Sequence, residues 1–159
     1  MSRVIKQYLE TSRMEIKNKI IYMKRINVSI GWSGDNYCAG AEGDGIDGVI
    51  IATHKTFKGV KKGFESALQF YIECGLRSGD ILPDWLTSGQ YELEYILETS
   101  ALIHSLDGIL SRSAIARATG INEKQIGHYA SGHRTPRPQQ RAKIINGIHA
   151  ISRELAAVV

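Results

Sequence analysis

The sequence predicts an α+β protein in two parts, a small sheet domain with one covering helix and then an all-helical domain. Residues 24–32 and 91–97 alternate apolar and polar side chains, which is the period of a half-buried strand. Residues 57–74 carry apolar side chains three and four positions apart, the pattern of a helix that packs on a sheet. After residue 98, short apolar-periodic segments separated by glycines indicate helices.

Composition excludes several classes of protein. The chain has 159 residues, room for one ordinary domain or two small ones, and is 43% hydrophobic and 23% charged, as in folded globular proteins. No apolar run approaches the ~20 residues that span a bilayer, and the N-terminus lacks an apolar signal core, so we expect a cytoplasmic protein without membrane contact.

Cysteine and histidine content gives no sign of a metal site or a cofactor. Cys38 and Cys74 lie far apart in the sequence, which indicates neither a disulfide framework nor zinc ligands. The five histidines are scattered, and His128 and His133, five positions apart, would not face one another on a helix. We therefore expect no metal and no cofactor.

Charge is distributed unevenly along the chain. Residues 1–25 carry a net charge of +5, residues 26–110 carry −7 and residues 111–159 carry +6. A division into basic, acidic and basic parts favours two functions with partners of opposite charge. Chance variation in charge between small domains is the alternative interpretation.

The N-terminal residues stand apart from the rest. Residues 1–22 are basic, and their apolar side chains follow no clean helical period. Met23 precedes the stronger globular pattern and is an alternative start codon. We therefore expect residues 1–22 to be an extension that is either disordered or not translated, and residues 23–98 to form the sheet domain.

The sheet domain begins with a hairpin. Residues 33–36 have turn chemistry between the strand at 24–32 and a returning strand at 37–41. Residues 42–48 predict a glycine-rich acidic loop, and residues 49–54, rich in β-branched side chains, predict a third strand.

One helix and one strand complete this domain. Thr56 is the predicted N-cap of a helix that runs to about Cys74, with Gly75 in the C′ position. A loop containing Pro83 then leads to the fourth strand at 91–97. The predicted order is β-β-β-α-β, a sheet with one helix on one face.

The second domain is predicted to span residues 99–159, with Thr99 as the cap of its first helix. Residues 112–132 predict two short helices joined by a tight turn, in which Gly120 takes positive φ and Asn122 caps the second helix. Four apolar positions predict the seam between these helices: Ile115, Ile121, Ile126 and Tyr129. This pattern is typical of a helix-turn-helix and resembles the domains of the Cro and phage-repressor group.

A basic module with this pattern is most simply a binder of DNA phosphates. We expect Arg112 to contact phosphate, and base edges to be read from the second helix. The full set of candidate DNA-binding residues is Arg112, Asn122, Glu123, Lys124, Gln125, His128, His133, Arg134 and Arg137. Operator binding by such modules usually takes two copies, so we expect a homodimer or higher homo-oligomer.

A final apolar series follows Pro138. Ile144, Ile148, Ile151 and Leu155 are spaced by four, three and four residues, which indicates one helix face. The face predicts either a dimer contact or packing against the domain's own first helix, and both remain open.

The order of elements over residues 23–155, with a helix reading TFKGVKKGFESALQFYIE and a loop reading ILPDWL, resembles the HicB-type antitoxins. The resemblance implies a partial ribonuclease-H-like N-terminal domain that binds and occludes a small basic HicA-type toxin, which cleaves mRNA. It also implies that the C-terminal helix-turn-helix represses the chain's own operon.

The acidic charge of the sheet domain fits a basic toxin. The candidate toxin-binding carboxylates belong to the hairpin turn and the acidic loop: Asp35, Glu42, Asp44 and Asp47. The alternative is that they form solvated acidic turns.

Enzymatic activity is not expected. Ribonuclease-H chemistry needs several carboxylates converging on two metal ions, and the sequence offers no obvious partner carboxylate on a later core element. A stand-alone transcriptional regulator, whose sheet domain senses a ligand or dimerises, is the alternative function.

Overall fold

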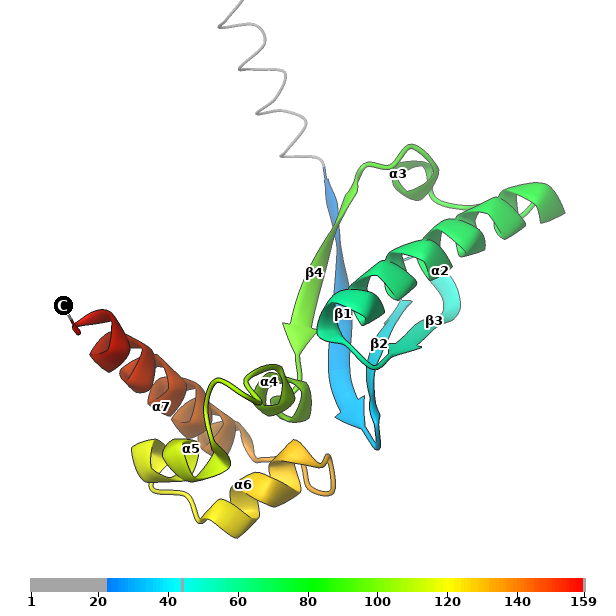
Figure 1. Ribbon diagram of the computed structural model, residues 1–159. Helices are drawn as coiled ribbons and strands as arrows, with labels where there is room; N and C mark the ends of the chain where they lie inside the picture. The colour runs from blue at the N-terminus through cyan, green and yellow to red at the C-terminus, as the bar shows by residue number, and fades with distance from the viewer. Residues whose placement is uncertain (1–22, 44, 159) are drawn as a thin grey trace, which may run out of the picture.

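The computed structural model describes residues 23–43 and 45–158, so the predicted extension at residues 1–22 and Asp44 lie outside the described residues. Within them, the fold is mixed α+β: a four-stranded sheet with its helices precedes a group of four helices (Figure 1). The predicted α+β class is therefore confirmed, and the predicted order β-β-β-α-β is observed with one additional short helix before the last strand.

The sheet has the strand order β3-β2-β1-β4. Its strands are β1 (Lys24–Ser33), β2 (Asn36–Gly43), β3 (Ile46–His54) and β4 (Tyr91–Leu97). The first three form an antiparallel meander, and β4 lies parallel to β1 at the sheet edge.

The predicted acidic loop at residues 42–48 is wrong in extent. β2 continues to Gly43 and β3 already begins at Ile46, which pairs with Gly43. Ile46 is only 5% exposed, so its burial in the core extends the hairpin through residues whose glycines and carboxylates indicate a loop.

Helix α2 (Phe57–Ser78) covers one face of the sheet (Figure 1). The Thr56 hydroxyl accepts a hydrogen bond from the Gly59 amide over 3.1 Å, which confirms the predicted N-cap. The predicted end is wrong, because the helix passes through Gly75 and ends at Gly79, which has φ of +80°. A Cβ at position 75 would lie 2.9 Å from Leu82 Cδ1, so this glycine permits a close approach and does not cap the helix.

The core between α2 and the sheet consists of alternate strand residues and one helix face. Its largest fully buried members are Ile26, Val28, Ile30, Val60, Phe64, Leu68 and Leu86. Leu86 lies on α3 (Asp84–Thr87), a short helix that the sequence pattern did not predict.

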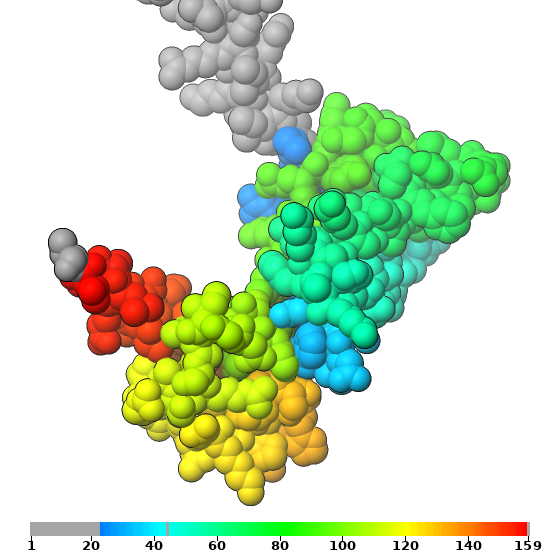
Figure 2. All heavy atoms as spheres, viewed as in Figure 1, coloured from blue at the N-terminus to red at the C-terminus, as the bar shows by residue number. Residues whose placement is uncertain are grey.

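The helical part consists of α4 (Thr99–Ser105), α5 (Arg112–Thr119), α6 (Glu123–Ala130) and α7 (Pro138–Ala156). Its separate core has seven buried members: Ile103, Ile115, Ile121, Ile126, Tyr129, Ala130 and Ile144. The space-filling view shows the sheet part and the helical part as two lobes (Figure 2).

Only Glu98 separates β4 from α4, and the two parts meet at this point. The Trp32 amide donates to the Ser100 hydroxyl over 3.0 Å, and the Trp32 ring stacks on His104 with centroids 4.0 Å apart. Glu98, not Thr99, occupies the N-cap position of α4, so the prediction for Thr99 is wrong. Thr99 is 5% exposed, and its hydroxyl accepts a hydrogen bond from Arg141 instead.

Candidate nucleic-acid interface

Helices α5 and α6 are joined by a three-residue turn whose geometry follows from its residues. Gly120 ends α5 with φ of +67°, a conformation that strains residues with a side chain. Asn122 then caps α6, because its Oδ1 accepts from the Lys124 amide over 2.9 Å. Both predictions are confirmed.

The predicted seam between these helices is also confirmed. Ile115, Ile121, Ile126 and Tyr129 are all at most 7% exposed and belong to one core. Thr119 joins this seam as a polar residue whose hydroxyl is satisfied: it donates to the Ile115 carbonyl over 2.8 Å and accepts from the Ile121 amide over 3.2 Å. The hydroxyl thereby joins α5 to the turn and stabilises it.

Burial of this seam leaves the opposite side of α6 and the adjoining loops in solvent. Seven of the candidate DNA-binding residues are exposed there: Arg112, Asn122, Glu123, Lys124, His133, Arg134 and Arg137. In the part of the chain that the structure describes, none of these four cations forms a side-chain ion pair. Their charges are therefore available to an anionic partner.

Gln125 and His128 differ from the other candidates because they are partly buried. The Gln125 amide donates to the Tyr129 hydroxyl over 2.7 Å, which directs it along α6 and toward the core. His128 lies with its ring centroid 5.4 Å from that of His133. The expectation that they would not face one another on a helix does not decide their separation, because His133 lies beyond α6: the helix ends before Ser131, and Gly132, with φ of +71°, turns the chain back.

The two histidines have no further metal ligand beside them. Across residues 23–43 and 45–158, no three His, Cys, Asp or Glu side chains converge to hold a metal ion.

Of the candidate toxin-binding carboxylates that the structure describes, Asp35 lies apart from Glu42 and Asp47. Asp35 lies in the turn between β1 and β2, while Glu42 lies near the other end of β2, seven residues or about 23 Å along the strand. Asp47, near the start of β3, is tied toward α2 because its amide donates to the Tyr71 hydroxyl over 2.9 Å. These residues are close together in the sequence, but β2 separates Asp35 from Glu42 and Asp47, which remain neighbours at the hairpin between β2 and β3.

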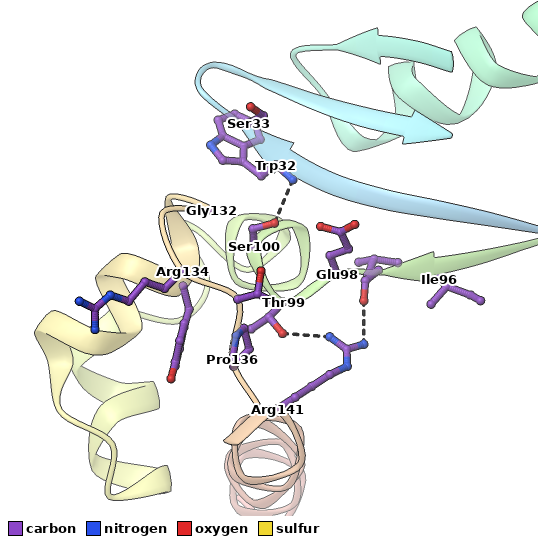
Figure 3. Close-up of a pocket in the computed structure, with 13 residues that line it drawn as sticks. Trp32, Ser33, Ile96, Glu98, Thr99, Ser100, Gly132, Arg134, Pro136 and Arg141 are labelled. Atoms are coloured by element: carbon purple, nitrogen blue, oxygen red, sulfur yellow. Dashed lines mark hydrogen bonds between the residues drawn. The ribbon is translucent and has the colours of Figure 1, made fainter. Parts of the chain in front are cut away.

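A cleft of about 510 Å³ lies where the sheet meets the helical part (Figure 3). It is bordered by Trp32 from β1, Glu98 and Ser100 at the start of α4, and Arg134 in the loop after α6. Arg141 spans it from α7, donating to the Leu97 carbonyl over 2.7 Å and to the Thr99 hydroxyl over 3.0 Å. Sequence reasoning did not single out Arg141, because its partners lie more than forty positions away.

Next to this cleft, His104 is enclosed between the two parts. Its Nδ1 lies 2.9 Å from Asp107 Oδ2, and Trp32 covers its ring. Burial lowers the pKa of His104 below its ordinary value of 6.5, and Arg112 adds to this effect, while the Asp107 carboxylate opposes it. Neutral His104 is therefore the form that fits the folded joint.

No protein-family description, curated protein or solved structure matches this chain. In the described residues, no helix combines the length and apolar character needed to cross a membrane.

Proposed function

We propose that the chain is an antitoxin of a type II toxin–antitoxin system, which represses its own operon and neutralises a basic, mRNA-cleaving HicA-type toxin by direct binding. In this proposal, α5 and α6 form a helix-turn-helix and α6 enters the major groove of operator DNA. The sheet part, a partial ribonuclease-H-like domain in this proposal, binds the toxin. No catalytic activity of its own is assigned to the chain.

The observation that carries the proposal is the asymmetry of α6. On one side of α6, Ile126 and Tyr129 are buried. On the other side, Glu123 and Lys124 are exposed to solvent, and Arg134 is exposed in the loop that follows. Helix α6 is held in this way and follows a three-residue turn, and the exposed cations near it form no ion pair in the described residues. Reading of base edges in the major groove requires a helix with these features.

The two roles assigned to this surface differ in kind. Arg112, at the first position of α5, lies beside the free amides of that helix end, and Arg134 and Arg137 lie in the loop before α7. These residues are suited to phosphate, which positions the protein without reading sequence. Glu123 and Lys124 are suited to base edges.

Charge supports the antitoxin role of the sheet part. Residues 26–110 carry a net charge of −7, against +6 for residues 111–159. The acidic sheet part favours a basic protein as its partner, and the basic helical part favours nucleic acid as its partner.

The test is co-expression of the full chain with the small basic protein encoded beside its gene. We expect a co-purifying complex and rescue of growth, and we expect rescue to persist in Lys124→Ala/Arg134→Ala, which removes DNA contacts only. A neighbour that is not toxic, or toxicity that the full chain does not relieve, contradicts the antitoxin role.

The cleft at the joint favours a second candidate function, a stand-alone transcriptional regulator that senses a ligand. Its border carries both a carboxylate, on Glu98, and a guanidinium, on Arg134, beside the Trp32 ring. A gene neighbourhood without a short basic reading frame, together with a metabolite that raises the melting temperature and shifts operator affinity, favours this candidate.

A further inference from the structure

On the face of the sheet that α2 does not cover, the size of the side chains differs between the central and the outer strands. Across the four strands, the paired residues Ile51, Gly40, Ser29 and Ile96 form one row. The two central strands carry small residues and the two outer strands carry isoleucines, so the row is low in the middle and high at both ends. The next row repeats small residues at its centre, where Gly31 pairs with Cys38.

The raised edges of this face are apolar and solvent-exposed. Ile51 is 59% exposed, Val49 beside it on β3 is 57% exposed, and Ile96 on β4 is 46% exposed. Outer strands three spacings apart are separated by about 14 Å, and a helix with its side chains is about 10–12 Å across. The strands that carry the isoleucine edges are therefore far enough apart, axis to axis, to flank one helix in the trough between them.

The ends of the trough are acidic. Glu42 lies at one end on β2, and the Glu98 carboxylate reaches over Gly31 at the other, where a Cβ would lie 2.8 Å from its Oε2. Glu98 Oε1 accepts from the Ser29 hydroxyl over 3.3 Å, so this carboxylate is held over β1 at Ser29 and Gly31, and the part of the trough that stays open lies over β2.

The remaining charges on this face leave it negative. On β4, Glu92 and Glu94 share Arg25, with N–O distances of 3.2 Å to each. Of the described strand residues that point to this side, Arg25 is the only cation. Among the strand residues and Glu98, four carboxylates therefore face one guanidinium, while at the Glu98 end Arg134 and Arg141 of the helical part line the same cleft as this carboxylate.

We infer that this open face is a docking surface for an amphipathic helix of a small basic protein, with the apolar stripe of the helix in the trough and its cations at Glu42 and Glu98. The inference rests on the proposed function and assigns the surface through which that function binds its protein partner. Exposed apolar patches rimmed by charge mark interaction sites, and complementary charge sets orientation and association rate.

A second copy of this chain fits the face poorly. A two-fold contact sets a patch against itself, so the same carboxylates would oppose one another. Like charges brought together in this way disfavour the pair, whereas a basic helix is favoured by every carboxylate on the face.

The experiment measures the affinity of the full chain for the co-expressed small basic protein by calorimetry, with three single variants. Ile51→Lys places a cation on the trough edge, and we expect it to weaken binding by about 30-fold or more. Glu42→Lys, at an exposed position, tests the acidic end without altering the apolar edge, and we expect about 5-fold or more.

The matched control is Phe70→Lys. Phe70 is 66% exposed on α2, on the opposite side of the sheet, so the same type of change is made away from the trough. We expect less than about 3-fold loss. Denaturation midpoints of all three variants, compared with the wild type, separate loss of binding from loss of folding.

Each other result overturns the inference in a recognisable way. If the wild type binds and Ile51→Lys weakens binding no more than Phe70→Lys, the surface is wrong and the proposed function stands. If the wild type does not bind, both are wrong. A mass that falls from dimer to monomer in Ile51→Lys identifies a second copy as the occupant.

The chain's own basic N-terminal residues are the last alternative occupant. This alternative predicts two results. The affinity for the partner is unchanged in Ile51→Lys, and the effects of Ile51→Lys and of Lys17→Glu/Lys19→Glu on the denaturation midpoint of the full chain are non-additive. Both results together mean that the N-terminal residues cover the face. That outcome also overturns the assignment to a protein partner.

Discussion

Arg141 Nη2 donates a 2.7 Å hydrogen bond to the main-chain carbonyl of Leu97, the last residue of the sheet. Its Nη1 donates to the Thr99 hydroxyl over 3.0 Å. The first turn of α7 is thereby fastened to the end of β4, and the sheet is held against the helices that we propose bind DNA.

Replacing Arg141 with Ala is expected to lower the free energy of unfolding by about 1.5–3 kcal/mol, because it removes charge-assisted hydrogen bonds to partly buried acceptors. Urea denaturation measures the loss. Arg137→Ala is the control, since Arg137 is exposed one turn earlier, and we expect its unfolding free energy to stay within about 0.5 kcal/mol of the wild type. Equal losses in the two variants contradict this role for Arg141.

Two helical glycines are expected to respond in opposite directions to alanine. A Cβ at Gly147 on α7 would lie 2.5 Å from Thr119 Cγ2 on α5, so Gly147→Ala must push these helices apart and cost about 1–3 kcal/mol. A Cβ at Gly127 on α6 meets nothing within 4 Å, so Gly127→Ala is expected to gain about 0.5–1 kcal/mol.

Thermal or urea unfolding measures both changes, and Thr119→Ser provides the internal control. Serine keeps the hydroxyl that braces the turn but removes the methyl group that obstructs position 147. We therefore expect Thr119→Ser to restore part of the stability lost in Gly147→Ala. A double variant with simply additive losses means that the two positions do not meet.

The contrast between these glycines also illustrates what the sequence can predict. Gly120 and Asn122 were identifiable because capping and positive φ are local requirements. Gly75 and Gly147 were not, because their partners, Leu82 and Thr119, approach them only in the folded chain. A glycine at such a position has the same sequence signature as one that ends a helix.

The apolar series on α7 shows the same limit. Ile144 is fully buried against the helical core and Ile148 packs partly on it, whereas Leu155 is 62% exposed. The sequence left dimer contact and internal packing open for the whole series. The structure assigns its beginning to internal packing, but mainly against α5, the second helix of this part, and not against the first helix as the sequence suggested.

The candidate site was predictable only where it lies on one local motif. The cations on and around α6 are close in sequence, and the structure leaves them exposed. The carboxylates Asp35 and Glu42 are also close in sequence, but one strand carries them to opposite ends. The open face of the sheet, by contrast, joins Ile51 to Ile96 across three strand pairings, which no local pattern reveals.

Stability is expected to fall as the solution is acidified below pH 6.5, through His104. Its pKa is lowered in the folded chain by burial, so the unfolded chain binds the proton more readily between the folded and unfolded pKa values. The contribution of His104 is complete above pH 6.5 and is lost as the pH falls through that value toward the folded pKa. Urea denaturation at pH 7.5 and pH 5.5 measures this difference.

His104→Gln is the control for this pH dependence. It keeps a polar side chain beside Asp107 but removes the titrating ring, so the difference between the two pH values is expected to shrink. An undiminished difference in His104→Gln assigns the dependence to other groups.

The phosphate role of Arg134 predicts a change in salt dependence and not only in affinity. Each cation that neutralises a phosphate releases condensed counterions, so the logarithm of the binding constant falls with the logarithm of salt concentration in proportion to the number of contacts. Removing one contact with Arg134→Ala is expected to weaken binding to all sequences and to make this slope shallower by about one unit. Fluorescence anisotropy with operator and unrelated duplexes, from 50 to 200 mM salt, is the measurement.

Lys124→Ala distinguishes a contact that reads the base sequence from one that only positions the protein on DNA. If Lys124 contacts a base edge, its loss lowers affinity for the operator more than for unrelated DNA, by about 1–3 kcal/mol of discrimination. Arg134→Ala should leave the ratio of the two affinities unchanged, since phosphates carry no sequence information. If the salt dependence of binding is unaltered in Arg134→Ala, Arg134 does not contact phosphate. This conclusion holds even if Lys124→Ala abolishes specificity, because counterion release and sequence specificity come from different contacts.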